Sequence, residues 1–215
     1  MTKAEIIDQI NKVTSSLIGV NLSDEQNFPS EKNGSIYISG NHDISISLRN
    51  ISYSEIYKIL NSSKNFNIKL VDGALIQMMY SFDANENLKK YRLAFFPSPD
   101  LEEFQNNSEY YLEDEVYADI VYKNIISTPL RFDYDPENHK VVQHPSSHLS
   151  IGQYKNCRIP LCKPITPFIF IDFILRNFYN TAQIKFAEEL AFDKKNTFDY
   201  CIHDLEKEIL HFNIA

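Results

Sequence analysis

Two long segments rich in apolar residues, the second of them with an alternating pattern, restrict the fold of this chain more than any other feature. They cover residues 74–82 and 88–96, and a polar stretch at residues 83–87 joins them. In the second segment the alternating residues are Lys90, Tyr91, Arg92, Leu93, Ala94 and Phe95. An alternation with period two is typical of a strand that buries one face. The two segments therefore predict an antiparallel hairpin.

Two further hairpins are predicted from shorter patterns. One lies near residues 35–48 and turns at Asn41-His42, whereas the polar residues 22–34 before it are expected to form a loop. The other lies near residues 130–151, where a clear alternation is followed by proline-containing turns. Together with the hairpin at 74–96, these patterns predict an antiparallel sheet of about five to seven strands.

Helices are expected on both sides of these strands in the sequence. Thr2 and Glu5 match a capping box before an amphipathic N-terminal helix. Thr166-Pro167 is a strong start for an apolar helix. Two more helices are predicted within residues 182–192 and 198–212, which makes three C-terminal helices. The apolar seam of the last one could pack internally or pair two chains in a homodimer.

These elements predict an α+β fold in which an N-terminal helix and three C-terminal helices pack against the antiparallel sheet. The expected organisation is a single domain over residues 1–215, with an acidic helical insertion at about 98–125 and a helical C-terminal part at 166–212. A chain of this length can bury a substantial core.

The negative charge of the chain is concentrated in one segment. The formal net charge is −8 at pH 7, and residues 98–122 hold eight acidic residues and no Lys or Arg. The candidate partner-binding residues in it are Glu113, Asp114, Glu115 and Asp119. One-sided charge favours a protein partner with a basic surface, although an acidic helix face is more often simply solvated. The overall charge excludes a strongly basic nucleic-acid binder, so nucleic acid could bind only at a local site.

Several classes of protein are disfavoured by what the sequence lacks. The phosphate loops of NTPases and dinucleotide-binding enzymes depend on glycine, and this chain has five glycines and neither loop motif. We therefore expect no nucleotide or dinucleotide cofactor. The N-terminus has no secretory apolar region, and Cys157, Cys162 and Cys201 are expected to be free thiols. No apolar stretch reaches the roughly 20 residues that cross a bilayer, so a cytoplasmic protein is predicted.

The stretch at residues 131–160 combines titratable side chains with arginines. It holds three of the six histidines and two of the five arginines. On the predicted sheet Arg131, Asp133, Asp135 and His148 share one face, and His144 lies at its rim. The register of the hairpin decides which histidine lies opposite which aspartate, and the sequence leaves that register open.

This stretch suits two kinds of chemistry. The candidate metal ligands are Asp133, Asp135, His144 and His148. Imidazole and carboxylate groups are ordinary ligands of a divalent metal ion, the one cofactor that these residues could hold. As catalytic residues the same four could transfer protons, while Arg131 or Arg158 binds a phosphate. The alternative is a solvated polar face with cross-strand Arg–Asp pairs.

Several segments of the chain resemble the bacterial DUF2290 family. They are HPSSHLSIG, NCRIP and KPITPFIFIDFILRNFY, and further upstream YRLAFFPSPDLEEF and DEVYADI, so the resemblance covers roughly residues 75–180. It implies a bacterial cytosolic protein without an established activity, encoded in variable genomic regions alongside defence genes. No catalytic residue of the family can be transferred to this chain.

Two functional hypotheses follow. The first is an accessory or binding component of an anti-phage defence-type system that acts through protein–protein contacts. The second is a divalent-metal-dependent nuclease or phosphodiesterase that uses the Asp/His cluster on the central sheet. We favour the first, because sequence spacing does not show that the side chains of the second converge.

Overall fold

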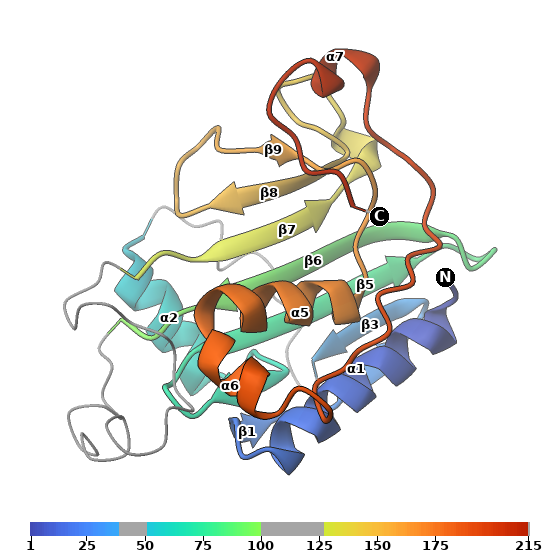
Figure 1. Cartoon of the computed structure of the whole chain (residues 1–215). Coiled ribbons are helices and arrows are strands. Elements are labelled where there is room, and N and C mark those ends of the chain that lie inside the picture. Colours follow the sequence, from blue (N-terminus) through green and yellow to red (C-terminus); the bar gives the residue numbers. More distant parts are fainter. Residues whose placement is uncertain (39–50, 100–126, 215) are drawn as a thin grey trace.

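The computed structural model describes residues 1–38, 51–99 and 127–214. These residues form an α+β fold, in which one antiparallel sheet carries helices on both faces (Figure 1). Helices α1 (Lys3–Gly19) and α5 (Pro167–Phe178) cover one face, and α2 (Tyr53–Ser62) packs on part of the other. The predicted fold class is confirmed. Residues 100–125 of the expected acidic insertion, with Glu113, Asp114, Glu115 and Asp119, lie outside the described residues.

The described part of the sheet contains nine strands. Their bounds are β1 Ser23–Gln26, β2 Pro29–Lys32, β3 Ser35–Ile38, β4 Ile68–Leu70, β5 Leu75–Phe82, β6 Leu88–Phe96, β7 Leu130–Tyr134, β8 Ser147–Ile151 and β9 Ile159–Pro160. The strand order is β1-β4-β5-β6-β7-β8-β9, and β3 joins β2 to β5. The hairpin predicted at 74–96 is the pair β5–β6. Strands β7 and β8 pair directly, and a short 3-10 helix at Pro136–Asn138 lies in their connection.

The first hairpin differs from the prediction. Strand β3 pairs with β2, within the segment expected to be a loop, and the turn falls at Asn33 and Gly34. Both turn residues have positive φ, 52° and 77°, as the tight turn of a two-residue hairpin requires. A Cβ at Gly34 would lie 2.7 Å from the backbone oxygen of Phe82, so this position also needs a residue without a side chain. The second half of the predicted hairpin lies outside the described residues.

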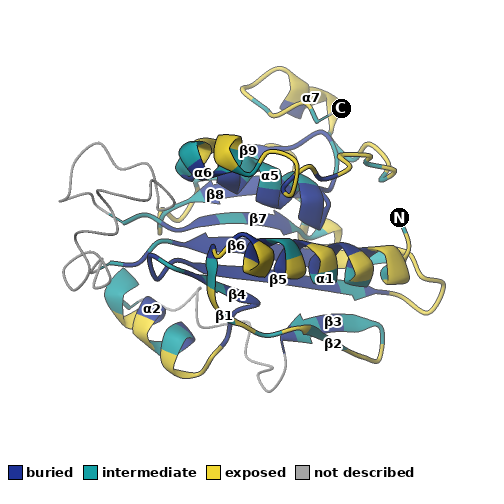
Figure 2. Ribbon diagram, turned by 60° about the horizontal axis from the view of Figure 1, so that its bottom comes forward, coloured by how far each residue is buried: buried dark blue, intermediate teal, exposed yellow. Residues whose placement is uncertain are grey.

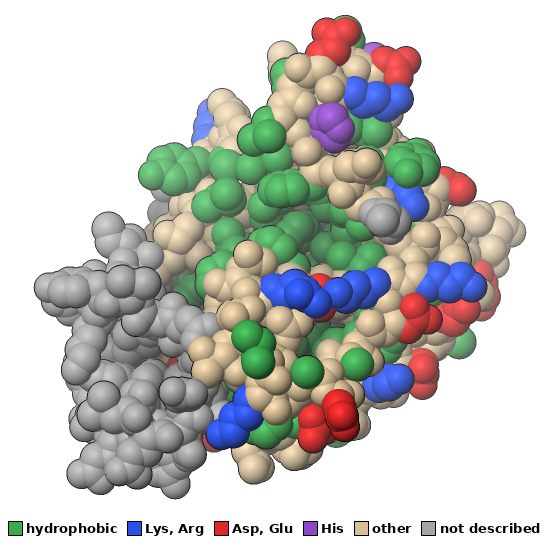
Figure 3. Space-filling model, viewed as in Figure 1, with side chains coloured by type: hydrophobic (Ala, Val, Ile, Leu, Met, Phe, Trp, Pro, Cys, Tyr) green, Lys and Arg blue, Asp and Glu red, His purple; other side chains and the backbone are tan. Residues whose placement is uncertain are grey.

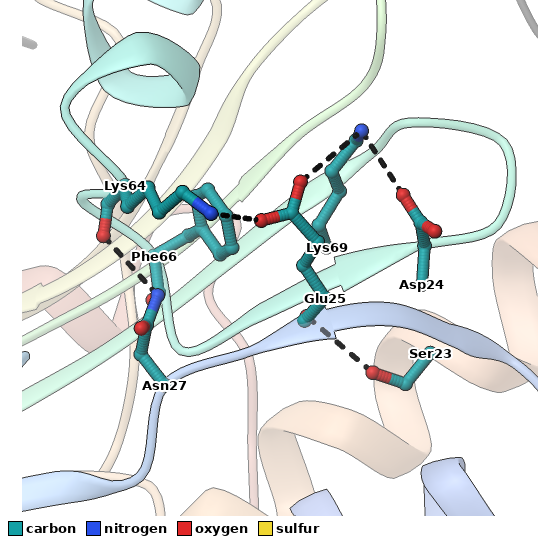
Figure 4. A network of polar contacts seen from close by, with 7 residues as sticks. All are labelled: Ser23, Asp24, Glu25, Asn27, Lys64, Phe66 and Lys69. Carbon is teal, nitrogen blue, oxygen red and sulfur yellow. Dashed lines mark hydrogen bonds and ion pairs between the residues drawn. The ribbon is translucent and has the colours of Figure 1, made fainter.

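Strand β1 is held at the edge of the sheet by polar contacts with β4 and the turn before it (Figure 4). The Lys69 ammonium lies 3.0 Å from a carboxylate oxygen of Asp24, and that of Lys64 lies 2.7 Å from Glu25. Asn27 donates from its amide to the backbone oxygens of Lys64 and Phe66. Exposed ion pairs contribute little stability, so the backbone pairing of β1 with β4 fixes this strand more than the charges do.

The main core lies between the sheet and the two covering helices. Helix α1 begins with the predicted capping box of Thr2 and Glu5, and its buried side chains recur every three or four residues. Helix α5 begins at the predicted cap Thr166. It packs over β6 and β7, where the ring of Phe173 meets that of Phe132 edge-on at 5.3 Å. Figure 2 shows the greatest burial in the middle of the sheet and little around the C-terminal segment.

The last two helices are shorter than predicted. Helix α6 spans Asn180–Lys185 and α7 spans only Asp204–Lys207. The prediction of one helix over 198–212 was wrong, because the flanking backbone bonds to the edge of the sheet. Cys201 donates to the oxygen of Cys162, and Phe212 donates to that of Pro160, both at 2.9 Å. Backbone groups used in this way are unavailable for helical hydrogen bonds.

Helix α7 is fixed by one fully buried carboxylate. Glu206 completes a capping box by accepting from the backbone of His203 at 3.0 Å. Its other oxygen accepts from the backbone of Val142 at 3.1 Å and lies 3.2 Å from the ring nitrogen Nε2 of His139. The C-terminal segment is thereby attached to the connection between β7 and β8.

Candidate functional site

The register of the sheet places three polar residues side by side on neighbouring strands. Arg92 of β6 is opposite Asp133 of β7, and Asp133 is opposite His148 of β8. The next residue on each strand faces α1 and α5, so this row lies on the other face of the sheet. The structure thus settles the register that the sequence left open, with His148 beside Asp133. All three residues are buried.

Arg92 and Asp133 form a buried ion pair. The guanidinium Nε of Arg92 donates to a carboxylate oxygen of Asp133 at 2.9 Å, and that of Arg131 lies 3.7 Å from the other oxygen. Burial raises the pKa of Asp133, but the two guanidinium groups outweigh it and hold the pKa below its ordinary value. Asp133 is therefore ionised and already paired.

Arg92 is a member of this site that sequence reasoning missed. The only signal for it was the alternation of residues 88–96, which puts Arg92 on the polar face of its strand without indicating the neighbouring strand. Arg92 lies 41 residues before Asp133 in the sequence, so the local motif at 144–148 gives no indication of this pairing.

The two histidines of the motif lie in contact and are poor proton acceptors. The ring of His148 is hydrogen-bonded through Nδ1 to the backbone oxygen of Pro145 at 2.8 Å, and the ring of His144 meets it edge-on at 4.9 Å. Burial lowers the pKa of His148 to about 4. Burial and the charge of Arg158 also lower the pKa of His144. At neutral pH both rings are neutral, and His148 Nδ1 carries the proton donated to Pro145.

The remaining candidates occupy two different places. Arg131 is opposite Ser150 of β8. Arg158 directly precedes Ile159, which is opposite Leu149, so Arg158 lies beside Ser150 as well. Asp135 lies beyond the end of β7 and is held apart by Lys90, at 2.9 Å, and by the Asn138 amide. The structure therefore brings together Arg131, Asp133, His144, His148 and Arg158. Asp135 is paired with Lys90 but lies near His144, since its charge partly offsets the lowering of the pKa of that ring by burial and Arg158.

The four predicted metal ligands do not form a set of free ligands. Asp133 faces two guanidinium groups, Asp135 faces an ammonium group, and His148 uses one ring nitrogen on a backbone oxygen. Within the described ranges, no group of three or more His, Cys, Asp and Glu residues is arranged to hold a metal ion. Metal binding by these residues would require breaking ion pairs that the fold already makes.

A second candidate feature is apolar and lies on the opposite face of the sheet. Helix α5 covers β6 and β7, but the sheet continues to β8 and β9. Hydrophobic side chains gather there, between α5 and α7 (Figure 3). We define the α5–β9 apolar surface as the partly exposed residues that pack against the core along this margin: Ile151, Ile159, Ile169, Phe173 and Ile214.

Comparison with protein families identifies a relationship over most of the chain. A family model described as an uncharacterized conserved protein, DUF2290, matches residues 22–214. The chain belongs to the DUF2290 family. The match confirms the resemblance and extends it beyond residues 75–180 to include every strand of the sheet. No curated protein and no solved structure matches this DUF2290 chain. Among the described helices, none has the length and apolar character needed to cross a membrane.

Proposed function

We propose that this protein is a binding component of a bacterial defence-type system and acts through contacts with another protein. The α5–β9 apolar surface is the observation that carries the proposal. It consists of aliphatic and aromatic side chains from a helix, two strands and the C-terminal segment, none of which is fully covered. A contiguous group of apolar side chains on a protein surface is typical of a site that binds another molecule.

The chemistry of the partner follows from the surface and the charge of the chain. An apolar centre requires apolar side chains on the partner. The net charge of −8 favours a basic rim around them, because unlike charges steer association and stabilise the encounter. The acidic residues of 98–122 would supply much of that attraction, and their part in binding is included in the proposal.

The hypothesis of a metal-dependent nuclease or phosphodiesterase has less support. Such an enzyme needs carboxylates and imidazoles that are free to bind a metal ion and activate its water. Asp133 is instead paired with Arg92, and His148 is almost completely buried. Cleavage of DNA or RNA with Mn²⁺ or Mg²⁺ that disappears in His148→Ala would reverse this order of preference.

The test compares the same substitution at matched positions. Ile151→Glu and Ile169→Glu place a charge on the apolar surface, whereas Ile18→Glu places one at the end of α1, where 38% of the side chain is exposed. A partner captured by the wild type from the source bacterium is purified and titrated against all four proteins. We expect the two surface variants to bind about tenfold more weakly or worse, which is at least 1.4 kcal/mol. Ile18→Glu should bind like the wild type.

Two outcomes would contradict the proposal. Equal binding of all four proteins would remove the apolar surface from the interface. A wild-type homodimer that Ile151→Glu dissociates, measured by light scattering after size-exclusion chromatography, would make a second copy of the chain the occupant. Lys substitutions at Glu113, Asp114 and Glu115 test the charge separately, because they should weaken binding mainly at low salt.

A further inference from the structure

Two buried nitrogen atoms beside the Arg92–Asp133–His148 row have no hydrogen-bond partner. They are Nε of Arg131 and Nδ1 of His144. Most buried polar atoms in folded proteins are hydrogen-bonded to protein, water or ligand. Nε of Arg131 lies 3.7 Å from its nearest carboxylate oxygen, which is too far for a hydrogen bond. Nε of Arg131 can only donate, so it indicates that a group with acceptor oxygens belongs beside β7 and β8. Nδ1 of His144 offers a second polar contact from the connection that joins these strands.

The charges around these atoms favour an anion. Two guanidinium groups, those of Arg92 and Arg131, flank the single carboxylate of Asp133, and the guanidinium of Arg158 lies close enough to affect Arg131 and His144. Burial lowers the pKa of Arg131, and the charge of Asp133 opposes this change. The positive charges of Arg92 and Arg158 lower the pKa further, which shows that the three guanidinium groups lie near one another. A second negative group would relieve this repulsion.

The possible donors lie on neighbouring parts of one sheet face. Arg131 of β7 is opposite Ser150 of β8, so the two share one face of the sheet. Arg158 directly precedes β9, whose Ile159 is opposite Leu149, and therefore lies next to Ser150. That face is the one opposite the α5–β9 apolar surface. Guanidinium groups hold phosphate oxygens with paired hydrogen bonds, and the serine hydroxyl adds a further donor.

We propose that Arg131, Ser150 and Arg158 bind the phosphate group of a small molecule, with the ring of His144 as a further contact. The Asp133 carboxylate lies 3.7 Å from Nε of Arg131 and its charge attracts the guanidinium. Only 16% of the Arg131 side chain is exposed, and Ser150 is buried, so the site takes a terminal or free phosphate. The backbone of a nucleic-acid duplex would not reach these groups.

The first experiment follows Arg131 directly in the wild-type protein. The Nε–H signal of Arg131 is assigned by NMR and followed during a titration with inorganic phosphate, at constant ionic strength maintained with chloride. Saturable movement of this signal and of the His144 ring signals is expected. No movement at millimolar phosphate, or movement that chloride produces equally, would overturn the proposal.

The second experiment measures affinity by calorimetry in matched variants. Arg158→Gln leaves the Arg92–Asp133 pair intact, and Arg131→Lys keeps the charge while it removes the planar fork of donors. Each is expected to weaken phosphate binding about tenfold. The control is Arg176→Gln on α5, which removes an exposed arginine paired with Asp172 at 2.9 Å, and it should bind like the wild type. Equal affinities in Arg158→Gln and the control would refute the site.

The source of the phosphate is distinguished by three ligands tested in parallel. They are inorganic phosphate, a mononucleoside monophosphate, and a single-stranded oligonucleotide that lacks terminal phosphates. Binding of either of the first two, with the losses expected in the variants, supports the proposal. Binding of the oligonucleotide alone would overturn it in favour of a nucleic-acid backbone site. Because the apolar surface lies on the other face, the partner-binding test remains independent of this result.

Discussion

The pH dependence of stability provides a sharp test of how His148 is held. The ring is 2% exposed and donates through Nδ1 to the oxygen of Pro145. Burial lowers its pKa from about 6.5, the ordinary value for the unfolded chain, to about 4 in the fold, so the folded protein resists protonation that the unfolded chain accepts. Because the pKa of His148 is lower in the folded protein than in the unfolded chain, its neutral ring does not reduce stability above pH 6.5. The free energy of unfolding decreases as the pH falls from 6.5 towards 4.

The magnitude follows from the difference between the two pKa values. One pKa unit corresponds to about 1.4 kcal/mol, so a group shifted from 6.5 to about 4 contributes roughly 3 kcal/mol of acid destabilisation. Little solvent screening is expected at a side chain as buried as His148. A decrease of this size is a large part of the 5–15 kcal/mol, roughly, by which single domains are stable.

The assay is urea unfolding at closely spaced pH values, in wild type and in His148→Gln. Glutamine can still donate to Pro145 but does not titrate, so the variant should lose about 3 kcal/mol less than the wild type between pH 6.5 and 4. Comparing the two proteins cancels the contribution of the carboxylates. His211→Gln is the control, since its ring lies at the surface near the C-terminus. Parallel curves for wild type and His148→Gln would refute the reasoning.

Three further substitutions test the fold. Glu206→Ala removes the fully buried acceptor that holds α7, so we expect a loss of about 2 kcal/mol and faster amide exchange around α7 in hydrogen-exchange measurements. Gly34→Ala places a Cβ against the backbone oxygen of Phe82 at a positive φ, so thermal unfolding should show a loss of at least about 1 kcal/mol. Tyr179→Phe removes a 2.8 Å hydrogen bond to the buried carboxylate of Asp72, and chemical unfolding should show a loss of about 2 kcal/mol; an unchanged midpoint in any of these variants would contradict the contact concerned.

The sequence predicted the fold best where side chains alternate strongly. Strands β6 and β7 bury one aromatic or aliphatic face in the main core, and that burial is visible as period two in the sequence, whereas β5 is buried on both faces. Strands β1 and β2 lie at the margin and consist largely of polar residues, so they carry no such signal. The Asn33-Gly34 turn was the available clue, since this dipeptide is a strong hairpin signal.

The segment 198–212 was predicted as one helix from its apolar spacing, but the structure has only the short helix α7 there. Apolar residues recur at helical spacing over 198–212, and Phe198 and Ile214 do pack against the core. The backbone, however, bonds to the edge at residues 160–162, where strand β9 would otherwise have unpaired groups. Spacing of side chains did not reveal that an open edge of the sheet competes for this segment.

The sequence predicted which face of the sheet carries the candidate site, but it did not predict which residues from distant parts of the chain pair with it. Alternation placed Arg131, Asp133 and His148 together, which the register confirms. Asp133 and His148 are buried and Arg131 is nearly so, and Asp133 is paired with Arg92 of β6. Arg92 lies far away in the sequence, so no local pattern indicated this pairing.

The buried ion pair between Arg92 and Asp133 is not explained by stability alone. Replacing a buried pair by apolar residues is often neutral or stabilising, so Arg92 and Asp133 need a reason beyond stability. We infer that Asp133 orients Arg131 for its ligand. Asp133→Asn should lower the free energy of unfolding by about 3–5 kcal/mol, because it removes the carboxylate charge that pairs with the buried guanidinium of Arg92.

The same variant separates orientation from charge. Removing a negative group makes the site more positive, so a purely electrostatic role predicts tighter phosphate binding in Asp133→Asn. A positioning role predicts weaker binding, because Arg131 loses the carboxylate 3.7 Å from its Nε. Calorimetry on the folded fraction, at low temperature and neutral pH, decides between the two signs. Weaker binding supports the orientation of Arg131 by Asp133, and tighter binding assigns Asp133 to the fold alone.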